Sequence, residues 1–310
     1  MIFFSVIIPT YNRSRLLINT VNSVLSQNYS HFEVIIVDDG STDDTGQVIL
    51  DTYSNDLRVR YFYKQNEERG AARNFGMKQA KGSYAVIFDS DDFMHADYLA
   101  AVENAIRTKS NRPINFLVTK YQTENEYGVI TQGHTYNFKE GWYGLNDILK
   151  GSSFGCLYII NLKNPNLIYF QEDRKYSILE DWLFLLENLS NDNIYLIDKV
   201  ALNIHQHTGN SLTNNQKVIS AKKETTKWAV NNIHLSPDQK KILLGWSHYF
   251  CSVHQYLDKK RLEAIKEALS AIKIGGVNLK FVSTLIKSII GRSFINRIKK
   301  NRKKQAVSTS

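Results

Sequence analysis

Cysteine is scarce in this sequence: the chain has two, Cys156 and Cys251, which lie far apart and follow no zinc or redox spacing. The pattern argues against a disulfide framework and predicts reduced, buried thiols in a reducing compartment. Tracts of low complexity are also missing, and 43% hydrophobic with 22% charged residues is the composition of an ordinary soluble protein. At 310 residues the chain has the length of about two domains, or of one large domain with an extension.

Long hydrophobic runs are missing as well. The apolar start, residues 1–8, has no basic segment before it and stops at Pro9, too soon for a signal peptide or a membrane span. The sequence therefore predicts a protein that stays in the cytoplasm. Neither a Gly-x-Gly-x-x-Gly fingerprint nor a P-loop Gly-Lys-Ser/Thr occurs, which argues against a dinucleotide oxidoreductase and a phosphate-cradling NTPase. Any nucleotide must be held in another way.

Positive charge is concentrated in one segment. Residues 259–304 hold 14 lysines and arginines against Glu263 and Glu267, a net charge of +12, whereas the whole chain has a formal net charge of +9. The rest of the chain is therefore about neutral. Such a local excess indicates an attachment device, and neither a DNA-docking motif nor an aromatic stacking pattern accompanies it. Nucleic acid is not an expected partner.

The first 110 residues alternate between two hydrophobic patterns. Short β-rich apolar runs cover residues 4–8, 32–37, 59–63 and 84–88, and helix signals cover residues 15–27, 45–53 and 71–80. Strands separated by helices imply right-handed crossovers and a mostly parallel sheet. The predicted fold class is α/β, with helices flanking the sheet.

The remaining sequence changes character twice. A helix at 97–107 is followed by a hairpin from 116–121 and 128–132, a strand at 156–160 and an apolar helix at 179–189. From residue 216 only helical patterns occur, at 222–234, 239–258, 262–274 and 279–300. We place a boundary near residue 215. It separates a domain of residues 1–215, with halves 1–110 and 111–215, from a helical C-terminal region of residues 216–310.

Three polar clusters follow predicted strands: Thr10-Tyr11-Asn12, Asp38-Asp39 and Asp89-Ser90-Asp91-Asp92. Because ligands of open α/β sheets bind beyond the carboxyl ends of the strands, we expect the clusters to converge on one edge. The carboxylates of the third cluster suit Mg²⁺ or Mn²⁺, but an Asp-rich turn with a helix cap gives the same pattern. In the second cluster one aspartate can cap a helix while the other accepts donors from a base or a ribose.

Two later pairs of residues also leave alternatives open. Glu180 and Asp181 head a predicted helix, where a carboxylate is either an N-cap or a general base at a cleft. His205 and His207 alternate along a predicted strand and point to the same face, which is a weak signal for a metal site.

A family resemblance connects these features. Residues 5–13 (SVIIPTYNR), 37–43 (VDDGSTD), 66–76 (NEERGAARNFG) and 89–92 (DSDD) resemble, in order and spacing, the family 2 glycosyltransferases. The match spans residues 3–110, and Glu180-Asp181 looks like that family's base motif. The resemblance implies a GT-A-type α/β sandwich, an inverting transferase and a nucleotide-diphosphate sugar donor.

The resemblance also implies residue roles. Those on the donor side are Pro9, Thr10, Tyr11 and Arg13 around the nucleoside, Asp39 at the base, Arg73 near the base or diphosphate, and Asp89 with Ser90 at the ribose. Asp91, with help from Asp92, would hold Mn²⁺ or Mg²⁺. His207, or else His205, would lie near the diphosphate and contribute to the same metal site. Asp181, next to Glu180, would be the catalytic base.

The C-terminal segment 279–304 combines apolar residues at helical spacing with lysines and arginines. This pattern predicts either an amphipathic helix on the anionic inner face of the cell membrane, or a helix packed on the protein body with a basic tail. Membrane attachment would suit a lipid-linked acceptor.

The function expected from the sequence is transfer of a hexose or N-acetylhexosamine from a UDP-sugar to a glycan or lipid-linked oligosaccharide, in the synthesis of a cell-surface polysaccharide or lipopolysaccharide. A transferase that makes a polyprenyl-phosphate sugar is the alternative within the enzyme class. Outside that class the alternatives are a catalytically inactive sugar-nucleotide binder and a nucleic-acid-binding protein.

Overall fold

The structure is a computed structural model that describes residues 1–109, 111, 113–151, 154–155, 157–206 and 214–292. The chain separates into two units. The larger consists of residues 1–148 and 152–210, and the smaller of residues 149–151 and 211–310. The division after residue 210 falls close to the boundary that the hydrophobic pattern places near residue 215.

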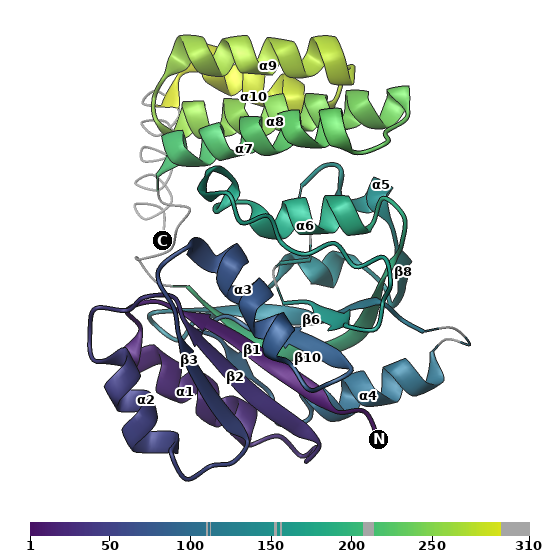
Figure 1. The fold of residues 1–310 in the computed structure, drawn as a ribbon. Helices are drawn as coiled ribbons and strands as arrows, with labels where there is room; N and C mark the ends of the chain where they lie inside the picture. The colour runs from purple at the N-terminus through teal and green to yellow at the C-terminus, as the bar shows by residue number, and fades with distance from the viewer. Residues whose placement is uncertain (110, 112, 152–153, 156, 207–213, 293–310) are drawn as a thin grey trace, which may run out of the picture. The chain divides into compact units, whose positions relative to one another are not determined.

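Among the described residues, a ten-stranded sheet forms the centre of the larger unit (Figure 1). Its main order is β3-β2-β1-β4-β9-β6-β10-β5, with β7 beside β6 and β8 beside β10. The strands are β1 (Phe4–Thr10), β2 (Phe32–Asp38), β3 (Val59–Tyr63), β4 (Tyr84–Ile87), β5 (Phe93–Met94), β6 (Phe116–Asn125), β7 (Ile130–Gln132), β8 (Gly141–Tyr143), β9 (Ile159–Asn161) and β10 (Ile194–Gln206). Strands β1, β2, β3 and β4 pair in parallel, which confirms the parallel sheet predicted for the first half. Strand β9 is antiparallel to both β4 and β6, and it joins this half of the sheet to the second half.

Helices flank the sheet of the larger unit. They are α1 (Ser14–Leu25), α2 (Thr45–Tyr53), α3 (Glu68–Gln79), α4 (Tyr98–Thr108), α5 (Leu145–Ile148) and α6 (Glu180–Asn188), with 3₁₀ turns at His134–Asn137 and Arg174–Tyr176. Figure 1 shows α3 on one face of the sheet and α1, α2 and α4 on the other. The α/β fold class expected from the alternating patterns is confirmed.

Strand β1 is buried along its whole length because helices cover both of its faces. Phe4, Val6 and Ile8 join the core that includes residues of α1, α2 and α4, whereas Ile7 faces α3. A Cβ atom added at Gly76 of α3 would lie 2.3 Å from Ile7 Cγ2, so glycine allows the helix to approach this closely. Burial on both faces explains why β1 has a continuous apolar run instead of alternating polar and apolar residues.

The smaller unit contains four described helices, α7 (Asn215–Asn232), α8 (Pro237–Leu257), α9 (Arg261–Gly275) and α10 (Leu279–Ile290). Ser236 and Gln239 form a capping box that starts α8. Gly245 of α8 and Gly275 of α9 meet backbone to backbone, since a Cβ atom on Gly245 would lie 2.6 Å from the Gly275 Cα. In the described part of the chain, every helix is too short or too polar to cross a membrane.

Helix α10 differs from the helix predicted over 279–300. It ends at Ile290 because Gly291 adopts φ +90°, a conformation that favours glycine and stops the helix. Phe281, one of the apolar residues of the predicted amphipathic pattern, is buried, and its ring contacts the rings of Trp246 and Tyr249 at 5.2 and 5.4 Å between centroids. The end of the predicted helix, residues 293–300, lies outside the described residues.

Candidate active site

The ends of β1 and β2 are tied together at the edge of the sheet where the first two polar clusters were expected to meet. The Asp39 backbone amide donates to the Thr10 carbonyl oxygen at 2.9 Å. The Asn12 side-chain oxygen accepts from the Thr42 amide at 2.8 Å, with Asn12 at φ +51°. Of the residues predicted around the nucleoside, Pro9 and Thr10 are buried, whereas Tyr11 is 47% exposed.

Asp38 has a structural role. Its Oδ1 accepts from the Ser41 amide and its Oδ2 accepts from the Tyr61 hydroxyl, both at 2.7 Å. Burial and the Asp38 carboxylate together raise the pKa of Tyr61, so this hydroxyl stays a donor. Helix α2 has Asp44 at its N-cap position, so neither aspartate of the second cluster caps it.

Asp39 is held through one oxygen only. Its Oδ1 accepts from the Lys64 ammonium at 2.8 Å and from the Glu67 amide at 3.0 Å, while Oδ2 has no partner among the described residues. Gly40 turns the chain here at φ +85°, and a Cβ atom would lie 2.8 Å from the Asn66 nitrogen. The buried carboxylate therefore keeps one acceptor for a ligand.

The carboxylates after β4 each have a different partner. Asp89 Oδ1 accepts from Arg73 at 2.9 Å, Asp91 Oδ2 pairs with Arg13 Nη1 at 3.1 Å, and Asp92 Oδ1 accepts from the His205 backbone amide at 3.0 Å. Burial, with the charges of Asp89 and Asp91, raises the pKa of Asp92 well above its usual range. Helix α4 has Asp97 at its N-cap position, so these aspartates do not cap it. Ser90, between them, is buried.

Arg73 joins two motifs that are far apart in the sequence. Its side chain is completely buried, and it pairs with Asp89 at 2.9 Å and with Glu180 Oε1 at 2.7 Å. The guanidinium also lies over the Phe170 ring, 5.4 Å from its centroid. The position of Arg73 near the diphosphate or base stays a prediction, and in the structure the buried side chain positions Asp89 and Glu180.

Asp181 follows Glu180 in the first turn of α6. The N-cap position belongs to Leu179, so neither carboxylate is the cap that the sequence left open. Asp181 Oδ1 accepts from the Trp182 amide at 2.7 Å. Burial and then the neighbouring Glu180 charge raise the pKa of Asp181 to about 6. A carboxylate with this pKa is ionised at neutral pH and is more basic than an ordinary aspartate.

A cavity of about 230 Å³ adjoins Asp91 and Asp92. His205 on β10 lines it, and so do Glu124, Asn203 and Phe93, which sequence reasoning did not select. The register of the parallel strands β6 and β10 places Glu124 opposite His205. Glu124 and Asn203 have no local sequence signal, since the pairing of strands about 80 residues apart brings them to the site, whereas Phe93 directly follows Asp92. His207 lies outside the described residues.

The donor set at this edge fits a hard divalent cation. Oxygen ligands from one or two carboxylates, completed by water and substrate phosphates, are what Mg²⁺ and Mn²⁺ use in such sites. Asp91 provides an accessible carboxylate, and Asp92 lies beside it. Among the described residues, no three His, Cys, Asp or Glu side chains form a group that could hold a metal ion by themselves.

Comparison with known proteins gives several similarities. The family model "Glycosyl transferase family 2" matches residues 5–167, more than half of the chain. The putative teichuronic acid biosynthesis glycosyltransferase TuaG of Bacillus subtilis is 32% identical over 185 residues, which are 59% of this chain and 71% of TuaG. An uncharacterized glycosyltransferase of Rickettsia felis is 43% identical over 124 residues, which are 40% of this chain and 20% of that protein. The chain thus aligns with about a fifth of the Rickettsia protein.

Solved structures share the fold. The crystal structure of Staphylococcus aureus TarS 1–349 in complex with UDP-GlcNAc has a TM-score of 0.66 and 23% identity, and the match covers 91% of this chain and 84% of that one. In sequence, the poly(ribitol-phosphate) β-N-acetylglucosaminyltransferase TarS is 31% identical over 197 residues, 62% of this chain and 33% of TarS. The family match and the TuaG relationship together establish that this chain belongs to glycosyl transferase family 2.

Proposed function

We propose that this protein is an inverting glycosyltransferase that moves a hexose or N-acetylhexosamine from a UDP-sugar to a hydroxyl group of a glycan or lipid-linked oligosaccharide. The observation that carries the proposal is the Arg73 bridge, which pairs with Asp89 after β4 and with Glu180, the neighbour of Asp181, at the start of α6. Transfer in a single displacement requires a donor site and a general base side by side.

The donor is assigned from the ends of β1 and β2. Asp39 offers one carboxylate oxygen while Lys64 and the Glu67 amide fix the other, so it can accept the N3–H of uracil. Tyr11 is exposed one residue beyond Thr10, whose carbonyl accepts from Asp39. The TarS structures with UDP-GlcNAc and with UDP support a uridine nucleotide in this fold.

Asp181 is the proposed general base. It takes the proton from the acceptor hydroxyl as that oxygen attacks the anomeric carbon on the face opposite the diphosphate, and one displacement inverts the configuration. A Mg²⁺ or Mn²⁺ ion, held by Asp91 and Asp92, would supply Lewis-acid neutralisation of the leaving diphosphate. Arg13, which the resemblance places at the nucleoside, pairs with Asp91 at 3.1 Å beside this proposed metal site.

The acceptor is proposed from the relatives and from the smaller unit. TuaG is named for teichuronic acid biosynthesis and TarS for poly(ribitol-phosphate) modification, which supports a cell-surface polysaccharide as the product here.

Helix α10 supports a peripheral membrane location, which would suit a lipid-linked acceptor. The α10 surface, which we define as Leu279, Lys280, Ile286, Lys287, Ile289 and Ile290, exposes four large apolar side chains beside two lysines. Residues 292–304 add seven lysines and arginines to the sequence next to it. Apolar residues flanked by basic ones suit the headgroup region of an anionic bilayer.

Calorimetric titration of the full chain with UDP, with and without Mn²⁺, tests the proposed function. We expect metal-dependent binding that Asp91→Ala abolishes. Asp181→Asn should bind UDP as the wild type does and transfer sugar at least a hundredfold more slowly, since general-base catalysis contributes roughly 10²–10⁴-fold. If UDP fails to bind under both conditions, the uridine assignment is wrong. If Asp181→Asn keeps full transferase activity, the base assignment is wrong.

A further inference from the structure

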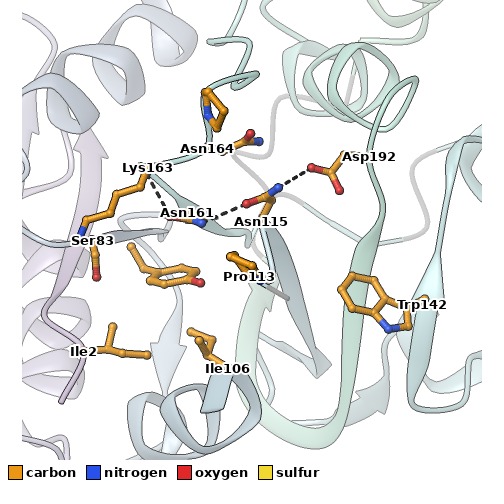
Figure 2. Close-up of a pocket in the computed structure, with 12 residues that line it drawn as sticks. Ile2, Ser83, Ile106, Pro113, Asn115, Trp142, Asn161, Lys163, Asn164 and Asp192 are labelled. Atoms are coloured by element: carbon orange, nitrogen blue, oxygen red, sulfur yellow. Dashed lines mark hydrogen bonds between the residues drawn. The ribbon is translucent and has the colours of Figure 1, made fainter. Parts of the chain in front are cut away.

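A second cavity lies at the opposite edge of the sheet from the carboxylates, and its volume is about 620 Å³ (Figure 2). Ser83 stands just before β4, Asn115 just before β6 and Asp192 before β10, while Asn161 ends the antiparallel β9. All four therefore lie where β1 begins, whereas the candidate active site lies where β1 ends. At about 3.3 Å per residue, the seven residues of β1 separate the two sites by roughly 20 Å.

A row of amide side chains along this cavity is fixed by its own hydrogen bonds. Asn161 Nδ2 donates to Asn115 Oδ1 at 3.0 Å, and Asn115 Nδ2 donates to Asp192 Oδ2 at 2.7 Å, as Figure 2 shows. The Lys163 backbone amide donates to Asn161 Oδ1 at 3.0 Å. The chain of bonds sets which atoms of each amide remain available to a ligand.

Two donors at this row have no partner among the described residues. Asn164 is 7% exposed, and its Oδ1 accepts from the Asn166 amide while its Nδ2 is unpaired. The Lys163 ammonium is likewise unpaired and extends toward Ser83 (Figure 2). Both donors are available to a ligand in the cavity that has hydrogen-bond acceptors.

The remainder of the lining is apolar. It consists of Ile2, Tyr84, Ile106, Pro113, Trp142 and Pro165. The Trp142 ring is held against Tyr195 at 5.1 Å between centroids. Among the described lining residues the charges are Lys163 and Asp192, of opposite sign, so the cavity does not select a polyanion. Apolar walls with a few fixed polar groups, in a volume between ~300 and ~1,000 Å³, are typical of small-molecule sites.

We propose that this cavity binds sugar units of an oligosaccharide. A pyranose ring has an apolar face for the walls and a rim of hydroxyl groups that can pair with the amide row, and it carries no charge. The inference rests on the proposed function in one respect, because it identifies the ligand as the acceptor or product glycan. A glycan held here would stay near the active site at a high effective concentration while its end reacts.

Saturation-transfer NMR on the full chain tests the proposal, with cellotetraose, chitotetraose and β-1,4-galactotetraose as probes and UDP as a separate arm. We expect saturation transfer to at least one tetrasaccharide. Ser83→Tyr, which fills the cavity, and Lys163→Ala, which removes an exposed donor, should each weaken it at least tenfold. Tyr127→Ala is the matched control, because Tyr127 is 88% exposed on the turn between β6 and β7 and lines neither cavity.

The outcomes separate this proposal from the proposed function. Absence of transfer to all three probes, or transfer that persists unchanged in Ser83→Tyr and Lys163→Ala, overturns the saccharide site. UDP binding should be equal in the wild type and both variants, which also shows that the variants are folded. If UDP does not bind to the wild type while a tetrasaccharide binds at this cavity, the donor assignment fails and the saccharide site stands.

Discussion

Of the interactions at the candidate active site, the ion pairs of Arg73 are the ones whose loss should lower the free energy of unfolding the most. Replacing Arg73 with Met removes the guanidinium that lies 2.7 Å from Glu180, whose side chain is only 2% exposed, and leaves this buried carboxylate with the half-exposed Arg69, whose Nε lies 3.4 Å away. Breaking a buried pair by removing one partner typically costs ~3–5 kcal/mol. Asp89 loses the same partner, but its side chain is 30% exposed and water can replace the arginine. Because Arg69 still pairs with Glu180, we expect Arg73→Met to lower the free energy of unfolding by about 3 kcal/mol, the lower end of that range.

Two further variants make the test specific. In Arg73→Met/Glu180→Gln the buried group is neutral, so part of the loss should be recovered, by at least ~1 kcal/mol. Arg107→Met is the matched surface control, because Arg107 pairs with Glu103 at 3.4 Å with its own side chain 68% exposed. Exposed pairs of this kind contribute ~1 kcal/mol or less.

Urea unfolding followed by tryptophan fluorescence measures these differences. A Trp228→Phe/Trp246→Phe background leaves Trp142 and Trp182 as the fluorophores, both in the larger unit, so the signal reports that unit. The reasoning is refuted if Arg73→Met costs no more than Arg107→Met, or if the double variant at positions 73 and 180 is no more stable than Arg73→Met alone.

Three more predictions follow from the site and from α10. Because Asp181 must be ionised to accept a proton, kcat/KM should fall as the pH drops through about 6. Glu180→Gln removes a negative charge that raises the pKa of Asp181, so the acid side of the pH profile of kcat/KM should move to lower pH. If the acid side does not move, Asp181 is not the general base. Gly40→Ala should destabilise the protein by about 1–3 kcal/mol in thermal unfolding, since φ is +85° and the new Cβ atom would lie too close to the backbone at Asn66. A change below about 0.5 kcal/mol, on the order of a neutral surface substitution, would mean that the turn at Gly40 relaxes to accept the side chain. Ile286→Ser/Ile289→Ser should weaken cosedimentation with phosphatidylglycerol vesicles at least tenfold, whereas equal binding of wild type and variant, or equal binding to phosphatidylcholine, would exclude the proposed membrane surface.

Much of the first half could be predicted from sequence because its signals are local. The apolar run before Pro9 and the helical spacing after Arg13 depend on neighbours in the chain, and both elements occur as expected. Asp38 and Asp39 are adjacent in sequence, yet only the structure separates the role of Asp38, which uses both oxygens, from that of Asp39, which keeps one available.

The rest could not be predicted because it depends on contacts between distant segments. Arg73 and Glu180 are 107 residues apart, and the sequence around neither residue indicates that the two form a buried ion pair. Glu124 reaches the site only through the pairing of β6 with β10. The end of α10 depended on one backbone angle at Gly291, which a periodic hydrophobic pattern does not encode.

The contacts of α3 limit how this protein can be recombined with its relatives. Asn74 exchanges two hydrogen bonds with the Phe170 backbone, at 2.8 and 2.9 Å, next to the Arg73–Glu180 pair. A chimaera joined near residue 110 would take α3 from one parent and residues 170 and 180 from the other. Such a hybrid keeps its buried charge balanced only if the second parent provides a carboxylate at the position of Glu180. The halves 1–110 and 111–215 are therefore exchangeable as matched pairs, and a library of hybrids should be screened first for this one buried pair.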